Sequence, residues 1–396
     1  MEFKKVKLGE IAKFNQKSYK SNYNWKTVKY LDTGNLNKNK VENLTTFNLR
    51  KEKLPSRAKR IPQINSILYS TVRPNQEHYG ILENKFDNLL VSTGFTVIDI
   101  YKENINPKYI YYFLTKKDIT AYLQKIAEDS VSTYPAIKPS DIKNLEILLP
   151  NRNNQDKIEQ ILSNLDSKIE INNKIISNLE SQAQAIFKSW FVDFEPFQDG
   201  NFVESELGMI PEGWEVKELG EFIPVKTGKK NANIAKDNGE YPFFTCSQDI
   251  SFTDVYSFDA NAILLAGNGD FNVKRYNGKF EAYQRTYVLI PYQEGQVGWI
   301  YNLIKYNLTK IVSGYKGSVI NYLTKGMIEK FKIAVPNDIN DLMILKNFNE
   351  IEVLISNLNN QNTKLAELRD ALLPKLMAGE IDVSNIKIEG EEVKNE

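Results

Sequence analysis

The most constraining feature of this sequence is an internal repeat, in which a closing strand is followed by a long helical pattern. Residues 145–187 contain LEILLP, a polar segment and a long helical pattern, and residues 331–373 contain FKIAVP and the same pattern. The two copies match at a constant offset of 186 residues, as in Pro150 and Pro336. An internal repeat constrains the architecture of a chain more than any single motif does. The sequence therefore predicts two similar globular domains, each followed by a long helix.

Both helical patterns place their packing residues at alternating spacings of four and three, which is the signature of a heptad repeat. Each pattern contains one Asn, and a polar residue at such a position lowers stability but fixes the register of the helices. The two Asn residues do not occupy equivalent positions in the repeat, so the repeat gives no reason for them to face each other. The predicted packing residues are Ile158, Leu162, Leu165, Ile169, Asn172, Ile176 and Leu179 in the first helix, and Ile351, Ile355, Leu358, Asn362, Leu365 and Leu372 in the second.

A helix of about 35 residues is about 50 Å long, which is too long to be buried against one small domain. The simplest partner for each helix is therefore the other helix. Further apolar residues widen the apolar stripe of the first helix, which indicates contact with an additional partner protein. Alternatively, these residues pack against the chain's own domains. The predicted partner-contact residues are Ile161, Ile171, Ile175, Phe187, Trp190 and Phe191.

Strand-like runs alternate with helical patterns in both predicted domains, which indicates a mixed α+β fold. Strands are predicted at 66–70, 96–100 and 145–149 and a helix at 107–127, and the second domain repeats this order with strands at 262–265, 287–290 and 331–335 and a helix at 297–310. The predicted division is a first domain at 1–150, a helix at 151–195, a linker and second domain at 196–336, a second helix at 337–380, and an acidic tail at 381–396 that is expected to fray.

The net charge of +1 conceals an uneven distribution along the chain. Residues 1–150 contain 25 basic and 15 acidic residues, whereas residues 200–336 contain 15 of each. The helical segments 151–199 and 337–396 have net charges of −3 and −6. A basic first domain is suited to a polyanion such as nucleic acid. The acidic helices are suited to protein contacts or to solvent, and the alternative for the basic domain is that its lysines only maintain solubility.

The densest basic cluster is residues 50–60, which contain six cations and a single acidic residue, Glu52. Such cations supply most of the sequence-independent affinity for DNA, and Arg is also the most common reader of guanine edges. Any one of these residues could be ordinary solvated surface, so the prediction depends on the cluster. The predicted DNA-binding residues are Lys51, Lys53, Arg57, Lys59, Arg60 and Arg73 in the first domain, and Lys229, Lys230, Lys274, Arg275, Arg285 and Lys316 in the second.

No catalytic motif is recognisable in the sequence. The single His78 and the single Cys246 leave little material for a nucleophilic triad, a disulfide or a metal site. There is no phosphate-binding glycine loop of the Walker type. No apolar run is long enough to span a membrane, and the first residues do not resemble a signal peptide, so the cytoplasm is the expected location. The sequence favours a binding protein over an enzyme.

Three longer segments are specific enough to indicate a family. They are LGMIPEGWE at 207–215, AIFKSWFVDF at 185–194 and LLPKLMAGEI at 372–381. With these segments, and along nearly its whole length, the chain resembles the specificity (S) subunit of type I restriction-modification systems. The resemblance implies two target recognition domains that each read one half of a split site in double-stranded DNA. It also implies two long antiparallel helices that form a coiled-coil spacer between those domains.

The same resemblance implies partners and assigns the chemistry to them. Two methyltransferase (M) subunits would bind the chain, and two restriction (R) subunits would join them in the full complex. S-adenosylmethionine, ATP and Mg would be bound by those subunits, so that this chain needs no cofactor or metal of its own. Because recognition domains vary within the family, the resemblance names no base-reading residue.

Other functions compete with this interpretation. The first is a stand-alone, sequence-specific DNA-binding protein with a coiled-coil interface, although no helix-turn-helix or zinc pattern is visible. The second is a fused methyltransferase and nuclease, which would need a methyl-donor loop and a catalytic motif. The third is an interaction scaffold whose basic domain is incidental, and neutralising residues 50–60 would separate it from a DNA-binding protein.

We expect the purified chain alone to transfer no methyl group to DNA and to cut no DNA, because its sequence lacks the motifs for either reaction. Incorporation of labelled methyl groups and cleavage of plasmid DNA are the measurements. Methyl transfer by the chain without an M subunit would contradict the interpretation as a non-catalytic subunit.

Overall fold

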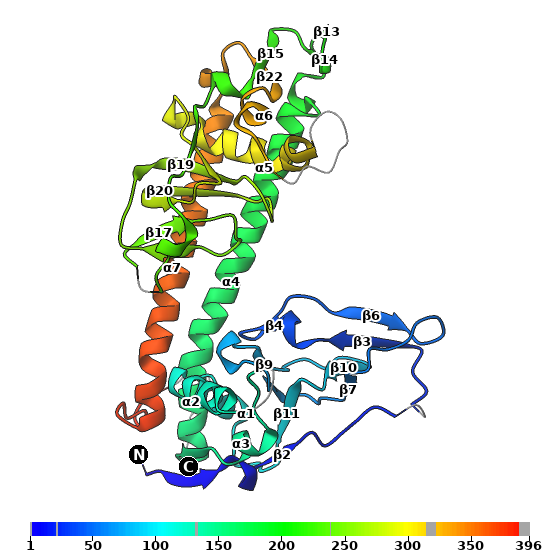
Figure 1. Cartoon of the computed structure of the whole chain (residues 1–396), viewed down its shortest axis with the longest axis vertical. Helices are drawn as coiled ribbons and strands as arrows, with labels where there is room; N and C mark the ends of the chain where they lie inside the picture. The colour runs from blue at the N-terminus through cyan, green and yellow to red at the C-terminus, as the bar shows by residue number, and fades with distance from the viewer. Residues whose placement is uncertain (1, 21–22, 131–133, 238, 314–321, 388–396) are drawn as a thin grey trace. The chain divides into compact units, whose positions relative to one another are not determined.

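The chain forms two compact units, which are described separately. The computed structural model describes residues 2–20, 23–130, 134–237, 239–313 and 322–387. Unit 1 consists of Met1–Ile169 with Thr363–Glu396, and unit 2 consists of Glu170–Asn362. The boundary crosses both long helices, α4 (Arg152–Phe191) and α7 (Met343–Ala378), so each unit has a globular head and one segment of each helix (Figure 1). Head 1 precedes α4 in the sequence, and head 2 lies between α4 and α7. Both heads are mixed α+β, which confirms the predicted fold class.

Head 1 contains two four-stranded sheets. Their strand orders are β6-β3-β10-β7 and β2-β11-β8-β9, and β3 and β10 are parallel. The strands of the first sheet are β3 (Thr27–Leu31), β6 (Thr45–Asn48), β7 (Ala58–Arg60) and β10 (Leu89–Ser92). Those of the second are β2 (Ala12–Phe14), β8 (Ile67–Ser70), β9 (Tyr79–Ile81) and β11 (Phe95–Ile100). Two shorter pairs join β1 (Lys4–Lys7) to β12 (Glu146–Leu149), and β4 (Leu36–Asn37) to β5 (Lys40–Val41).

The helices of head 1 are α1 (Pro107–Leu114), α2 (Lys117–Glu128) and α3 (Pro139–Lys143). The single helix predicted over 107–127 is therefore two helices, because Lys116 leaves the helical conformation at ψ 138°. Asn106 caps α1 by accepting from the backbone N–H of Lys108 at 2.8 Å, as a side chain at this position commonly does. The apolar faces of these helices pack on the unit 1 segments of α4 and α7 in one core.

Head 2 is built on one six-stranded sheet with the order β16-β21-β19-β20-β17-β18. Its strands are β16 (Val225–Thr227), β17 (Tyr241–Phe244), β18 (Ser251–Thr253), β19 (Phe258–Ala266), β20 (Val273–Ala282) and β21 (Thr286–Leu289). Two short pairs join β13 (Phe202–Ser205) to β14 (Gly208–Pro211), and β15 (Trp214–Glu218) to β22 (Lys332–Pro336). Helices α5 (Val297–Ser313) and α6 (Lys325–Glu329) complete the head, whose core surrounds the fully buried Trp299.

The internal repeat is visible in the backbone of both heads. In each, an antiparallel strand pair joins the start of the head to its end, β1 to β12 in head 1 and β15 to β22 in head 2. A 3-10 turn follows the first strand of each pair. The backbone N–H of Leu8 donates to Leu145 at 3.0 Å, and that of Leu219 donates to Phe331 at 2.9 Å. The two acceptors are 186 residues apart, as the sequence repeat predicts.

Helices α4 and α7 run antiparallel within each unit. In unit 1, Arg369 Nη1 donates to Asp166 Oδ1 at 2.6 Å, and Lys157, earlier on α4, reaches the carbonyl of Ser384, beyond the end of α7. In unit 2, Asn172 contacts Asn362, and the later Phe191 lies beside the earlier Phe348 with ring centroids 6.5 Å apart. Every packing position predicted from the heptad pattern is buried or half-buried, as a helix–helix seam requires.

Asn172 and Asn362 do face each other, contrary to what their positions in the repeat suggested. The Nδ2 group of Asn172 donates to Asn362 Oδ1 and to Gln361 Oε1, both at 2.8 Å. Asn362 Nδ2 donates in turn to Asn173 Oδ1 at 2.9 Å. Equivalence in a repeat is a constant difference in residue number, whereas antiparallel packing pairs residues whose numbers have a constant sum. Two non-equivalent residues can therefore be opposite each other.

The C-terminal segment is partly packed rather than frayed. Of the predicted tail at 381–396, the structure describes residues up to 387. Val383 is fully buried in the core of unit 1, and the carbonyl of Ser384 accepts from Lys157 Nζ at 2.9 Å. Acidic composition predicted a solvated tail, but the apolar Ile381 and Val383 attach its first turn to head 1.

Replacing Asn172 by Ala should lower the free energy of unfolding by about 1–3 kcal/mol, because the amides of Asn362 and Gln361 lose their buried partner. A double variant, Asn172→Leu with Asn362→Leu, should recover most of this loss, since it removes both polar groups together. Urea denaturation of both variants is the measurement. A single variant as stable as the parent chain would show that the Asn contact does not hold the helices together.

Candidate nucleic-acid interface

The basic run predicted to bind DNA lies on the surface of head 1, in the turn after β6 and along β7. Lys51, Lys53, Arg57 and Lys59 are exposed, and no ion pair within the described part of the chain involves them. Arg60 differs, because it is half-buried and burial lowers the pKa of its guanidinium. The first four residues are therefore available to phosphates, whereas much of the Arg60 side chain is covered by the head itself.

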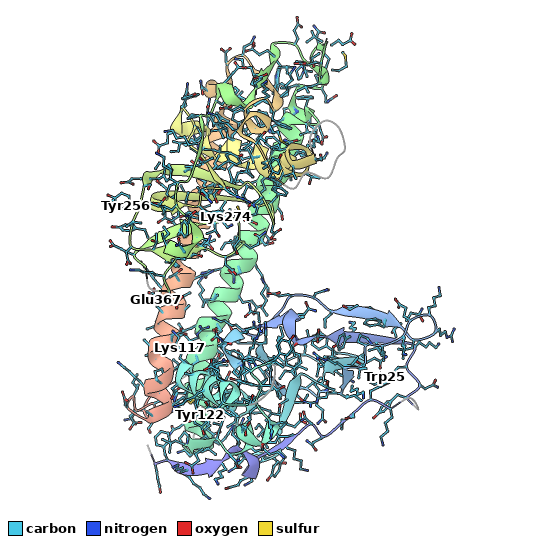
Figure 2. All side chains as sticks on the ribbon, in the orientation of Figure 1. Trp25, Lys117, Tyr122, Tyr256, Lys274 and Glu367 are labelled. Carbon is cyan, nitrogen blue, oxygen red and sulfur yellow. The ribbon has the colours of Figure 1, made fainter. Side chains whose placement is uncertain are left out.

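An aromatic cluster lies directly beside this basic run, and sequence reasoning missed it. The rings of Tyr19 and Trp25 stack with centroids 5.3 Å apart, and Tyr23 lies 5.1 Å from Trp25. The backbone N–H of Tyr19 donates to the carbonyl of Lys59 at 2.7 Å, which joins the two segments. Trp25 lies on the side of unit 1 away from its helices (Figure 2). The signal in the sequence is the interleaving of aromatic and basic residues at 19–26, a composition that suits stacking on bases or sugars.

Arg73 is exposed at the end of the segment that follows β8. Its backbone has φ 46°, in the left-handed region that non-glycine residues rarely adopt. The guanidinium lies over the ring of Tyr134, 5.8 Å from its centroid. Backbone strain at a residue whose side chain is exposed points to a functional rather than a packing role.

The predicted cations of head 2 fall into different environments. Lys229 and Lys230 are exposed, and Arg285 is exposed at the edge of a cavity of about 430 Å³. Lys274 is half-buried, and its Nζ donates to the carbonyl of Ser247 at 2.6 Å (Figure 2). Burial lowers the pKa of Lys274. Lys316 lies outside the described residues.

Arg275 is a structural residue, which corrects its prediction as a DNA contact. Its side chain is only 13% exposed, and its Nη1 lies 3.8 Å from Glu352 Oε2 on α7, whose side chain is 7% exposed. Its Nε donates to Asn261 Oδ1 at 3.1 Å. Burial raises the pKa of Glu352, and the charge of Arg275 opposes that rise. The sequence could not reveal that the partner of this arginine lies on a distant helix.

The residues predicted to contact a partner divide between core and surface. Ile171 and Ile175 on α4 are 51% and 40% exposed. Phe187 and Phe191 are 2% and 8% exposed and belong to the core of unit 2, where Trp190 also packs. Ile161 packs against the core of unit 1. The apolar stripe is wide because the ends of α4 pack against the heads as well as against α7, so the alternative interpretation holds for Phe187 and Phe191.

The exposed apolar residues of α4 and α7 are not copies of each other. Ile171 and Ile175 correspond in the repeat to Asn357 and Gln361, which are polar. On α7, the exposed Met343, Val353 and Leu354 line a groove of about 800 Å³. The two helices therefore present different apolar residues to any partner.

Two further searches of the described residues found no such feature. No group of three or more His, Cys, Asp and Glu side chains is arranged to hold a metal ion within the described ranges. No helix in the same ranges is both long enough and apolar enough to cross a membrane.

Comparisons with known proteins agree on one family. The family model of the type I restriction modification DNA specificity domain matches residues 1–181 and 211–367. The chain is 32% identical over 331 residues to the type I restriction enzyme MjaIX specificity subunit of Methanocaldococcus jannaschii, covering 75% of this chain and 74% of that one. It is 25% identical over 471 residues to the HindI specificity subunit of Haemophilus influenzae, covering 96% of this chain and 100% of that one.

The match to the EcoDI specificity subunit of Escherichia coli is closer but shorter, with 38% identity over 181 residues that cover 44% of this chain and 40% of that one. Among solved structures, the type I S subunit from M. genitalium aligns with a TM-score of 0.56 at 17% identity, covering 95% of this chain and 96% of that one. At this identity the likeness supports the fold alone.

Replacing Arg275 by Ala should lower the free energy of unfolding by about 3–5 kcal/mol, because it leaves Glu352 buried without a countercharge. The raised pKa of Glu352 means that protonation favours the folded state, so the loss should be smaller near pH 5 than near pH 8. Denaturation at both pH values is the measurement.

The exposed Lys229→Ala variant is the matched control and should change stability by less than about 0.5 kcal/mol. Adding Glu352→Gln to Arg275→Ala should recover part of the loss. Equal stability of Arg275→Ala and Lys229→Ala would show that Arg275 has no structural role.

Proposed function

The chain belongs to the type I restriction modification DNA specificity family, and we propose that it selects the DNA target of such a system. Each head reads one half of a bipartite site in double-stranded DNA. Helices α4 and α7 set the gap between the halves and dock the methyltransferase subunits, to which restriction subunits are added in the full complex. The chain acts in the cytoplasm, where it has access to the host DNA.

The observation that carries this proposal is the exposed basic surface of head 1 beside its stacked aromatic rings. Lys51, Lys53, Arg57 and Lys59 have no competing acid in the described ion pairs, so their charges are available to a polyanion. Cations of this kind supply the salt-dependent part of DNA affinity. The neighbouring Tyr19 and Trp25 add flat apolar surface for bases or sugars.

The repeated backbone supports a split target. Both heads begin and end with the same antiparallel strand pair and 3-10 turn, so both reach the helices through the same backbone frame. Their surface cations differ in number and position, and head 1 is the more basic of the two. Two heads with one frame and different surfaces are suited to two half-sites of different sequence.

The helices support a fixed gap between half-sites. Helix α4 has 40 residues and is therefore about 60 Å long. The Asn172–Asn362 contact specifies one register for α4 and α7. A helix pair held in one register is stiffer than a flexible linker and can keep two recognition domains at a defined spacing.

The exposed Ile171 and Ile175, on an acidic helix pair, are suited to contact with a protein rather than with DNA. We assign this region to the methyltransferase subunits and expect two of them per chain, because the helices are repeated. S-adenosylmethionine, ATP and Mg then belong to the partner subunits. Since the exposed apolar residues differ between the helices, the two docking sites would share their backbone and differ in their side chains.

Reversing the charges of Lys53, Arg57 and Lys59 to Glu should weaken DNA binding by the assembled complex for all sequences alike. The plot of log affinity against log salt should become shallower by about one unit for each lost phosphate contact. Fluorescence anisotropy at several salt concentrations measures both effects.

The matched control reverses Lys4, Lys5 and Lys7, three exposed cations of β1 in the same head. This control should leave the salt dependence close to that of the parent complex. Equal effects of the two triple variants would mean that only net charge matters, and the basic run would not be an interface.

Inserting one heptad into α4 after Ile176 and one into α7 before Leu358 should lengthen the preferred gap by about three base pairs. Seven residues add about 10 Å of helix, and base pairs are about 3.4 Å apart. Sequencing of the methylated positions in DNA modified by the complex gives both the half-sites and the gap.

Both half-site sequences should be unchanged by the double insertion. A heptad inserted into α4 alone is the control, and it should destabilise the chain because the two seams no longer match. A double insertion that altered the recognised bases rather than their spacing would show that the helices read DNA themselves.

A further inference from the structure

Three chain segments of head 2 meet at one backbone junction at the end of β19. The backbone N–H of Gly267, just after this strand, donates to the carbonyl of Arg285 at 2.8 Å. The N–H of Leu323 donates to the carbonyl of Gly267 at 2.7 Å, and Asn268 forms a bridge with Tyr322. The residue that ends a strand is thus held between the turn before β21 and the segment before α6.

The same junction exists in head 1, made by residues that the sequence repeat does not match. The N–H of Thr71, just after β8, donates to the carbonyl of Gly94 at 2.8 Å. The N–H of Ile137 donates to the carbonyl of Thr71 at 2.8 Å, and Val72 forms a bridge with Ala136. The strand pairings agree with this alignment, because β8 pairs with β11 as β19 pairs with β21.

Each junction carries one exposed arginine and one exposed tyrosine. In head 1, the Arg73 guanidinium lies 5.8 Å from the ring centroid of Tyr134. In head 2, Arg285 and Tyr322 line the same cavity of about 430 Å³. Both tyrosines are 62% exposed, so neither contributes mainly to a core.

The two arginines do not occupy equivalent backbone positions. Gly94 of head 1 is in the position of Arg285, and Gly269 of head 2 is in the position of Arg73. The tyrosines are also on non-equivalent positions of the third segment. The Arg and Tyr combination was therefore not simply inherited by duplication of one sequence. Instead, two different sequences place the same pair of side chains at the same point of the fold.

The packing of the heads does not account for these side chains. Neither Arg73 nor Arg285 takes part in an ion pair among the described residues. Arg73 also holds a left-handed backbone conformation, which costs about 1 kcal/mol or more and persists only where the surroundings enforce it. In head 2 the cavity is additionally lined by Asn268 and Gln284, whose amides can both donate and accept.

We propose that the two junctions are the base-reading sites of the two heads, with Arg73 and Arg285 each contacting a guanine in its own half-site. This inference rests on the proposed function. An arginine fork donates to O6 and N7 of guanine in the major groove, and this pairing distinguishes G·C from the other base pairs. The tyrosine ring orients the guanidinium from one face, and the amides of Asn268 and Gln284 are placed to read an adjacent adenine.

The test uses the chain assembled with its methyltransferase subunit. Sequencing the methylated positions in DNA modified by the parent complex defines the bipartite target. Methylation rates are then measured on the target duplex and on duplexes with single base-pair changes in either half. The variants are Arg73→Ala, Arg285→Ala and Arg285→Lys, and the control is Lys236→Ala, an exposed cation of head 2 that pairs with Asp254.

Arg285→Ala should reduce discrimination at one G·C pair of one half-site by about fivefold to 150-fold and leave the other half-site unaffected. Arg73→Ala should do the same in the opposite half-site. Arg285→Lys should retain the salt dependence of binding but not the discrimination, because an ammonium lacks the planar fork. Lys236→Ala should change neither. Thermal melting should be unchanged in all four variants, since the replaced side chains are exposed.

A uniform loss of rate on every duplex, with unchanged base preference, would overturn the inference and identify these arginines as phosphate contacts. Unchanged discrimination in Arg73→Ala and Arg285→Ala would overturn it as well. A parent complex that methylates no bipartite target would instead contradict the proposed function, and this outcome is visible before any variant is made.

Discussion

The hydrogen bonds between Asn172 and Asn362 are the interaction on which the arrangement of the helices depends. Apolar residues at heptad spacing favour contact between two helices, but they do not choose among registers that differ by one heptad. A buried amide has one register in which its partner is present, and every other register leaves it unsatisfied. In this register Asp166 of α4 also meets Arg369 of α7, and burial, which lowers the pKa of that guanidinium, is outweighed by its bonds to two carboxylates, so the pKa stays above its ordinary value. One polar contact thus selects the register that the ion pair requires.

A constant frame and a variable surface are combined in each head. The frame consists of the closing strand pair, the 3-10 turn and the three-segment junction, all of which are held by backbone hydrogen bonds. Backbone contacts do not depend on side-chain identity, so they persist while the surface changes. The side chains that differ between the heads lie beyond these contacts, at strand ends and in turns. This separation allows a head to change what it recognises without losing its attachment to the helices.

Regular periodicity was the part of the structure that the sequence predicted well. The heptad positions, the 186-residue repeat and the mixed class of the heads all follow from spacing within one segment. Contacts between distant segments did not. Arg275 read as a free cation because its partner Glu352 is on a helix later in the chain. Phe187 and Phe191 read as a partner surface because periodicity does not show which neighbour covers an apolar face. The two tyrosines and Trp25 beside β7 form a cluster only after folding.

The division of the chain into units has a consequence for its synthesis. Unit 2 is one continuous stretch, whereas unit 1 combines the first 169 residues with the last 34. The core of unit 1 includes Leu373, Leu376 and Val383, so it cannot be completed while the ribosome still holds the end of the chain. Domains usually fold in the order in which they emerge. Here the head that emerges first is finished last, and its apolar surface stays uncovered through translation of the whole second head. Nascent chains, and chains truncated near their end, should therefore depend on chaperones to protect head 1.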